Sequence, residues 1–184
     1  MKILSGKHKN KTIEVPKKFV RPTSGMVKEA MFNILEYSYG GLDGKNVLDI
    51  CCGSGALGLE ALSRGAGRAK FIDNNRRGLE TVKQNADKLG ELEQCEFICC
   101  YAEQVRFSDD EKYGVVFIDP PYEKNIIPKI MQKLPPVLAD EHIIIVEQRN
   151  REALDISDDF ELLKKRNYGD THILFYKFCK TNCS

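Results

Sequence analysis

From residue 46 onward, short apolar runs alternate with segments whose apolar residues recur at helical spacing. Short apolar runs bounded by polar turns are typical of strands buried on both faces, and such strands form parallel sheets covered by helices. The alternation therefore predicts an α/β chain with a doubly wound, mostly parallel sheet. The expected parallel strands are 46–50, 69–73, 95–100, 115–119 and 142–147, with helices from the glycine-rich turn to residue 64 and over 76–89 and 126–134.

The end of the chain differs from this pattern. Residues 160–166 and 171–178 are strand-like, and the turn residues Asn167-Tyr168-Gly169-Asp170 join them, which predicts an antiparallel hairpin. A seven-stranded, mostly parallel sheet that ends in such a hairpin is the arrangement of class I methyltransferases. Dinucleotide dehydrogenases usually lack the hairpin.

The first 40 residues predict a small appendage, a β-hairpin over residues 2–15 and a helix that ends at Gly40-Gly41. We therefore expect two parts, 1–40 and 41–184. Residues 1–30 hold eight Lys or Arg and two Glu, a net charge of +6, whereas the remaining 20 basic and 25 acidic residues give −5. Such a basic arm suits a polyanionic partner, although charge alone equally fits a solvated hairpin.

Composition excludes several other classes. The longest apolar runs are too short to span a bilayer, and no apolar core follows the first lysine, so we expect a cytoplasmic protein without a membrane segment. The seven cysteines are odd in number and include two adjacent pairs, which argues against a disulfide framework. No CxxC pair is present, and the three histidines lack ligand spacing, so no metal is expected.

A glycine-rich loop follows the first parallel strand and opens the next helix. Gly53, Gly55 and Gly58 match GxGxxG, and Asp73 lies 20 residues beyond the first of them, so a dinucleotide enzyme is one reading. Asp49 favours another cofactor, because it stands inside the strand just before the loop. A carboxylate there can organise the amino acid end of S-adenosylmethionine, whereas a pyrophosphate would be repelled.

The sequence after the fourth parallel strand is Asp119-Pro120-Pro121-Tyr122. In an open α/β sheet, ligands bind beyond the carboxyl ends of the strands, so this tetrapeptide and the glycine loop should meet. The Asp119 carboxylate and the Pro120 carbonyl can accept hydrogen bonds from an exocyclic amine of a base, and Tyr122 offers a face for stacking. Catalysis by positioning alone would then suffice.

With these motifs in view, the chain resembles the RsmD family, bacterial 16S ribosomal RNA guanine-N2 methyltransferases. Three further stretches carry the resemblance: Arg21-Pro22-Thr23 with Lys28-Glu29-Ala30-Met31-Phe32-Asn33-Ile34-Leu35, Gly55 to Ala66, and Tyr168-Gly169-Asp170-Thr171. Where the family commonly has an Asp that contacts the adenine of the cofactor, this chain has Tyr101-Ala102-Glu103, so Glu103 or a backbone group is expected to replace it.

The resemblance implies a cofactor, a base site and a partner. The base site comprises Asp119, Pro120, Pro121 and Tyr122, which would hold a flipped guanine. The residues expected to bind S-adenosylmethionine are Asp49, Cys51, Gly53, Ser54, Gly55, Asp73, Asn74, Ala102 and Glu103. Those expected to bind RNA are Lys7, Lys9, Lys11, Arg21, Thr23 and Lys28. The partner implied is 16S rRNA in the 30S subunit or its assembly intermediate, and a monomer is expected.

Three alternatives remain open on the sequence. An adenine-N6 methyltransferase of DNA or RNA shares the chemistry but typically carries Asn-Pro-Pro-Tyr. An NAD-dependent oxidoreductase would leave the Asp-Pro-Pro-Tyr turn unexplained. A non-catalytic ribosome assembly factor would bind particles without methyl transfer. Because side chains cannot read the major groove of A-form RNA, recognition should combine RNA shape with one extruded base.

Overall fold

The protein forms a seven-stranded sheet in the computed structural model, which describes residues 1–15, 25–108, 110–120, 126–148 and 154–179. The strand order is β3-β2-β1-β4-β5-β7-β6. The strands are β1 (Asn46–Ile50), β2 (Arg68–Asp73), β3 (Cys95–Cys99), β4 (Tyr113–Ile118), β5 (Leu138–Gln148), β6 (Phe160–Tyr168) and β7 (Thr171–Phe178). Pairs among β1 to β5 are parallel, and β7 pairs antiparallel with both β5 and β6.

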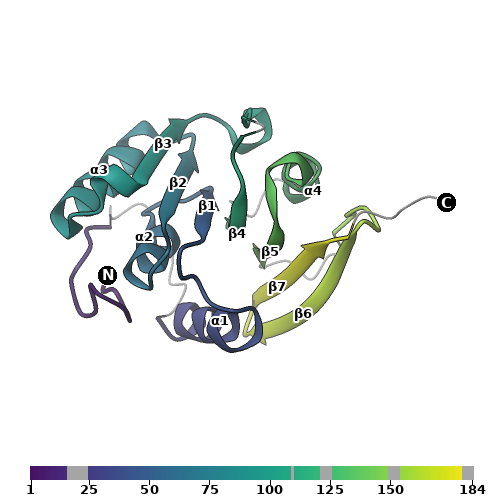
Figure 1. Ribbon diagram of the computed structural model, residues 1–184, viewed down its shortest axis with the longest axis horizontal. Coiled ribbons are helices and arrows are strands. Elements are labelled where there is room, and N and C mark those ends of the chain that lie inside the picture. The colour runs from purple at the N-terminus through teal and green to yellow at the C-terminus, as the bar shows by residue number, and fades with distance from the viewer. Residues whose placement is uncertain (16–24, 109, 121–125, 149–153, 180–184) are drawn as a thin grey trace.

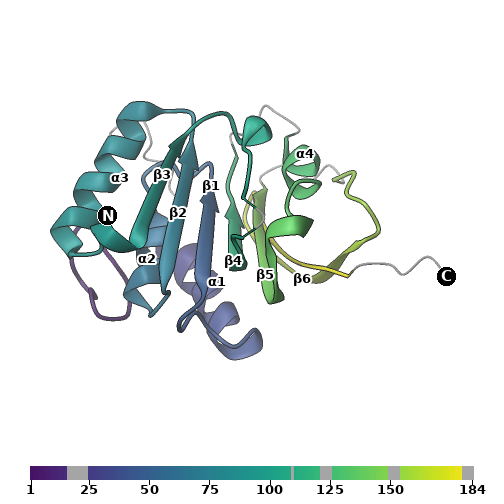
Figure 2. The same ribbon diagram turned by 45° about the horizontal axis from the view of Figure 1, so that its top comes forward.

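Helices cover both faces of this sheet, as the alternating pattern predicts. The helices α1 (Gly25–Ser38), α2 (Ala56–Ser63) and α3 (Arg76–Leu89) contribute to one buried cluster, and the short α4 (Ile127–Met131) contributes to the other. The two views show α2 and α3 beside β1 to β3, and α1 beside the β6–β7 hairpin (Figures 1 and 2). We call the layer of α1, α2 and α3 the long-helix face.

Helix ends follow from local sequence. The Asn75 side chain accepts a hydrogen bond from the Gly78 N–H at 3.0 Å and so caps the start of α3. Gly90 ends this helix in the left-handed region, at φ 76°. After α1, Gly41 also has a positive φ, and its N–H returns to the Leu35 carbonyl at 3.1 Å.

The N-terminal hairpin is reduced to one antiparallel bridge, between Lys2 and Thr12. Two of its apolar side chains, Ile3 and Ile13, are 0% and 1% exposed and belong to the same buried cluster as the three long helices. The segment 1–15, here called the N-terminal arm, therefore packs on the body of the protein through a shared core.

Several element boundaries differ from the expected ones by a few residues, most of all at β5. Strand β5 begins at Leu138 rather than at residue 142, and the Pro135–Val137 segment is a 3-10 turn immediately before it. Proline at the first position of that turn loses no hydrogen bond, which explains why the turn tolerates two prolines. Among the described residues, no helix is long and apolar enough to cross a membrane.

Candidate active site

The predicted site residues lie at the carboxyl ends of β1, β2 and β4, here called the site edge. Asp49 on β1 accepts a hydrogen bond from the Gly58 N–H at 2.9 Å. Asp73 at the end of β2 accepts one from the Gly53 N–H at 2.9 Å and another from the Asn75 N–H at 2.8 Å. The two carboxylates thus fix both ends of the glycine loop.

The three glycines of the loop have different roles. Gly53 has φ 54°, and a Cβ added to it would meet no atom within 4 Å, so its backbone faces open space. At Gly55 and Gly58, an added Cβ would lie 2.4 Å from a Val82 methyl and 2.3 Å from the Phe71 ring, respectively. Gly53 is therefore suited to close approach by a ligand, whereas Gly55 and Gly58 allow α2 to pack on the sheet and on α3.

Asp49 is ionised only with difficulty. Burial raises the pKa of its carboxyl to about 7, the nearby Asp73 adds to this increase, and the hydrogen bond from Gly58 opposes it. Burial also raises the pKa of the Cys51 thiol to about 12, so this cysteine stays protonated at neutral pH. It is therefore not poised as a nucleophile.

Four predicted carboxylates surround Cys51, which itself has a positive φ of 60°. After burial, the further causes of its raised pKa are the negative charges of Asp73, Asp119, Asp49 and Glu103. Residues from four separate segments of the chain therefore lie within electrostatic reach of one atom. The site edge is strongly acidic.

Asp119 follows β4 directly and stands beside the glycine loop. Its N–H donates to the Ile50 carbonyl at 3.2 Å, so the tetrapeptide begins where β1 passes into the loop. Pro120 is buried. Pro121 and Tyr122 lie outside the described residues.

The segment after β3 completes the site edge. The Cys100 N–H donates to the Asp73 carbonyl at 3.1 Å, which ties this segment to the end of β2. The buried Ala102 and the half-buried Glu103 form a 3-10 turn, while Asn74 is exposed. These positions allow the predicted contacts with a cofactor without testing them.

The residues predicted to bind RNA fall into three groups. Lys7, Lys9 and Lys11 are exposed on the N-terminal arm, where the first forms an ion pair with Glu91 at 2.7 Å. Arg21 and Thr23 lie outside the described residues. Lys28 was expected to contact RNA, but the structure places it in the core.

Lys28 is only 3% exposed, and its Nζ lies 3.0 Å from Glu60 Oε2. Glu60 is fully buried and also accepts hydrogen bonds from the Leu4 and Ser5 N–H groups and from Arg64 Nε. Burial on α1 and this ion pair exclude Lys28 from phosphate contacts. The prediction for this residue is therefore corrected to a role in attaching the N-terminal arm and α1 to α2.

Glu147 is a residue that the sequence analysis missed. Ile118 pairs with Val146, so the next residues, Asp119 and Glu147, lie side by side at the ends of β4 and β5. Glu147 is 4% exposed. A charged residue directly after the apolar run of β5 was the available signal.

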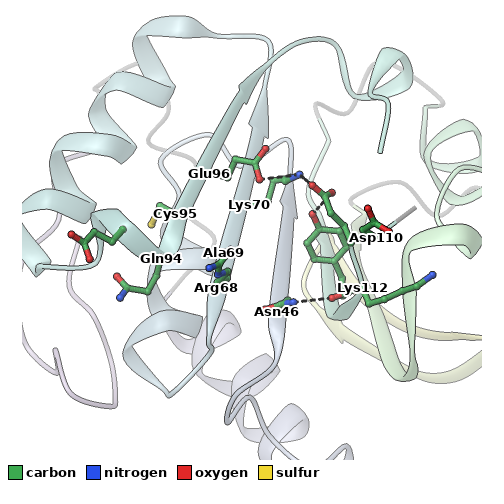
Figure 3. A pocket seen from close by; sticks show the side chains of 12 residues that line it. Asn46, Arg68, Ala69, Lys70, Gln94, Cys95, Glu96, Asp110 and Lys112 are labelled. Atoms are coloured by element: carbon green, nitrogen blue, oxygen red, sulfur yellow. Dashed lines mark hydrogen bonds and ion pairs between the residues drawn. The ribbon is translucent and has the colours of Figure 1, made fainter. Parts of the chain in front are cut away.

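A separate cavity of about 230 Å³ lies at the opposite edge of the sheet (Figure 3). Asn46, Arg68 and Cys95, which begin three parallel strands, line it, and none of the predicted site residues does. Lys70 lies between two carboxylates there, 3.0 Å from Glu96 and also paired with Glu111. This cavity is thus distinct from the site edge.

Comparisons with known proteins agree with this geometry. The sequence model of the family described as Conserved hypothetical protein 95 matches residues 1–177. Ribosomal RNA small subunit methyltransferase D of Escherichia coli K12 is 30% identical over 157 residues, covering 80% of this chain and 74% of the relative. An uncharacterized methylase of Rickettsia prowazekii, RP545, is 28% identical over 97% of this chain and 98% of its own.

Solved structures show the same fold. The structure of yhhF from Escherichia coli, provisionally described as a methyltransferase, has a TM-score of 0.84 at 27% identity, covering 97% of this chain and 98% of that one. A ribosomal protein L11 methylase from Lactobacillus delbrueckii has a TM-score of 0.69 at 16% identity, covering 94% and 88%. The expected class I methyltransferase fold, with its terminal antiparallel hairpin, is confirmed.

Proposed function

Because the chain belongs to the family described as Conserved hypothetical protein 95, the RsmD family that its motifs resemble, we propose that it methylates ribosomal RNA of the small subunit. The methyl donor is S-adenosylmethionine, and the acceptor is the exocyclic N2 of a guanine. The methyltransferase name of the Escherichia coli relative supports the RNA substrate.

The observation that carries this proposal is the gathering of Asp49, Asp73, Asp119 and Glu103 around Cys51. The cofactor is cationic at its sulfonium and carries an ammonium group, so an acidic edge attracts it. A dinucleotide presents a pyrophosphate, which the same carboxylates would repel. The charge of the site edge therefore favours methyl transfer over hydride transfer.

The fit of the cofactor can be argued residue by residue. Gly53 leaves open space for close approach, and Asp73 keeps acceptor capacity on both oxygens beyond its two backbone hydrogen bonds, which suits a ribose diol. Asp49 would accept a hydrogen bond from the ammonium group. When bound, S-adenosylmethionine supplies the methyl group.

The chain's own groups would hold the acceptor amine. An exocyclic amine is a weak nucleophile, because its lone pair is delocalised into the ring. The Asp119 carboxylate and the Pro120 carbonyl would accept its two hydrogens and turn the nitrogen lone pair toward the methyl group. Tyr122 would stack on the flipped base. The proton lost on methylation would leave through the Asp119 carboxylate.

The test is transfer of a labelled methyl group to small ribosomal particles that lack the modification. Wild type and Asp119→Ala are compared, the product nucleoside is identified by mass spectrometry, and S-adenosylmethionine binding is measured by calorimetry. We expect N2-methylguanosine from wild type only, with the cofactor bound by both proteins. N6-methyladenosine would overturn the substrate. Particle binding without any product would favour an assembly factor, and calorimetric binding of NAD instead would favour an oxidoreductase.

A further inference from the structure

Strand β6 carries three consecutive basic residues at the open edge of the sheet: Lys164, Lys165 and Arg166. The last two are exposed and the first is half-buried. Within the described residues, none of the three forms an ion pair. The basic residues that do so are Lys7, His8, Lys28, Arg64, Lys70 and Lys88. The charge of this run is therefore available to a partner.

The Tyr39 ring, directly after α1, lies next to this run, and Tyr37 lies near the end of the same helix. The Lys164 Nζ is 3.2 Å from Ser38 Oγ and 5.8 Å from the centre of the Tyr39 ring. Burial raises the pKa of the Tyr39 hydroxyl, and the Arg166 charge opposes that increase, so Arg166 lies near the same ring. Tyr37 is 86% exposed, the highest value among the large hydrophobic side chains described. A basic run near a helix that carries an exposed ring suits phosphates near a base.

The register of the sheet relates this surface to the site edge. Arg166 pairs with Ile173, which pairs with Glu147, the neighbour of Asp119. Arg166 is thus level with Asp119, three strands away, or roughly 14 Å at about 4.8 Å per strand. Ile173 and Phe175 belong to the cluster beneath α1, and Lys164 reaches Ser38 of that helix, so Lys164 and Arg166 border the long-helix face. Lys165 pairs with Leu174 of the other cluster and points to the opposite face of the sheet edge.

The two basic segments lie at opposite ends of the sheet, and the arm contacts Ser63 at the end of α2 that is remote from the glycine loop. The N-terminal arm packs against α2, near the β3 end of the sheet, and β6 forms the opposite end, with β1 and β4 at the centre. Both views show the arm and the β6–β7 hairpin at opposite ends of the molecule (Figures 1 and 2).

We propose that Lys164, Lys165 and Arg166 bind the phosphates of the substrate RNA while Tyr37 stacks on one of its bases, forming a second RNA anchor at the β6 end of the sheet. The inference rests on the proposed function for the identity of the RNA. This anchor is level with Asp119, so it would hold the RNA backbone close to the reacting nucleotide.

Another protein is a weaker candidate for this surface. An exposed edge strand can pair with a strand of a partner chain, but lysines on an edge oppose such pairing. Lysines can occur on an edge strand only to prevent such pairing. That role does not require an exposed aromatic ring nearby, such as Tyr37. The two explanations differ in salt dependence, because phosphate contacts release counterions.

The experiment measures affinity for small ribosomal particles lacking the modification, at salt concentrations from about 50 to 200 mM. The variant Lys164→Gln/Lys165→Gln/Arg166→Gln is compared with wild type and with the matched triple Arg68→Gln/Lys83→Gln/Lys129→Gln, whose three side chains are exposed elsewhere. Three lost contacts should reduce the slope of log affinity against log salt by about 2 to 3. Methyl transfer at saturating particle should stay unchanged, with the loss confined to KM.

Tyr37→Ala and Tyr37→Phe test the stacking contact. Alanine should weaken binding by about five- to a hundredfold, and phenylalanine should retain it. An unchanged salt slope in the β6 triple variant, or an equal loss in the matched triple, overturns the proposal. A loss that is independent of salt assigns the surface to a protein instead. If wild type binds particles but transfers no methyl group, the proposed function fails. The salt dependence of particle binding then still tests whether the β6 run binds RNA.

Discussion

At the scale of single residues, the burial of Asp49 bears on the cofactor binding that we propose. Its pKa of about 7 is raised first by burial, so most of this carboxyl is protonated below pH 7. Because the pKa of Asp49 in the folded protein lies above its usual value, ionising this carboxyl lowers the folding stability. The stability that is present below about pH 4 is therefore lost as the pH rises toward 7. A cationic ligand next to Asp49 would reverse this cost.

We therefore expect S-adenosylmethionine to bind more tightly as the pH rises to about 7. Below that value, binding must release the Asp49 proton, so affinity should change by up to about tenfold per pH unit and become constant above it. Calorimetry from pH 5.5 to 8.5 on wild type and Asp49→Asn measures this dependence. The amide variant should bind more weakly and without the pH-dependent part. Equal slopes in the two proteins would remove Asp49 from the ammonium site.

The glycines show how much of the site could be predicted at this scale. The GxGxxG spacing predicted a loop between β1 and α2, and the structure has a loop there. The spacing could not separate Gly53, which faces open space, from Gly58, where a Cβ would meet the Phe71 ring at 2.3 Å. That difference depends on a side chain from the next strand, which local sequence does not report.

At the scale of elements, the buried Glu60 joins three segments. It lies on α2, pairs with Lys28 of α1 and Arg64 of its own helix, and accepts the N–H groups of Leu4 and Ser5 from the N-terminal arm. Since α2 begins at the glycine loop, this one carboxylate connects the basic arm to the helix that follows that loop.

Glu60→Ala should lower the free energy of unfolding by about 3–5 kcal/mol, because it leaves Lys28 buried without its partner. Denaturant unfolding followed by circular dichroism measures the loss. Glu60→Gln should cost less, since its amide oxygen still accepts from the arm. Hydrogen exchange at Leu4 and Ser5 should accelerate in the alanine variant. A change of less than about 1 kcal/mol in that variant would show that the pair contributes little.

The elements themselves were largely predictable, because their patterns are local. All seven strands lie where periodicity placed them, with shifts of a few residues such as the earlier start of β5. The hairpin over residues 2–15 was wrong in detail, since only one bridge forms and Ile3 and Ile13 pack on the helices instead. Lys28 was misassigned for a related reason. Its charge suggested solvent, and only the tertiary partner Glu60 explains its burial.

At the scale of the whole molecule, charge alternates along the sheet. The N-terminal arm and β6, at the two ends of the sheet, are basic, whereas four carboxylates gather at the site edge. An RNA backbone would be attracted to the two flanks and repelled from the centre. Only a base without its phosphates would then approach Asp119 closely, which matches chemistry on an extruded nucleotide.

This arrangement predicts a preference for ribonucleoprotein particles over naked RNA. The sheet holds the two basic flanks at a fixed separation, so the RNA segments that bind them must also be held apart. A particle supplies that geometry, whereas free RNA must lose conformational entropy to adopt it. We expect kcat/KM for methyl transfer to be at least about tenfold higher on small ribosomal particles than on deproteinised 16S rRNA at the same salt concentration.

In Lys9→Gln/Lys11→Gln, which weakens one flank, the rate on particles should fall toward that on free RNA. Equal activity of wild type on both substrates would show that one flank and the extruded base suffice for recognition.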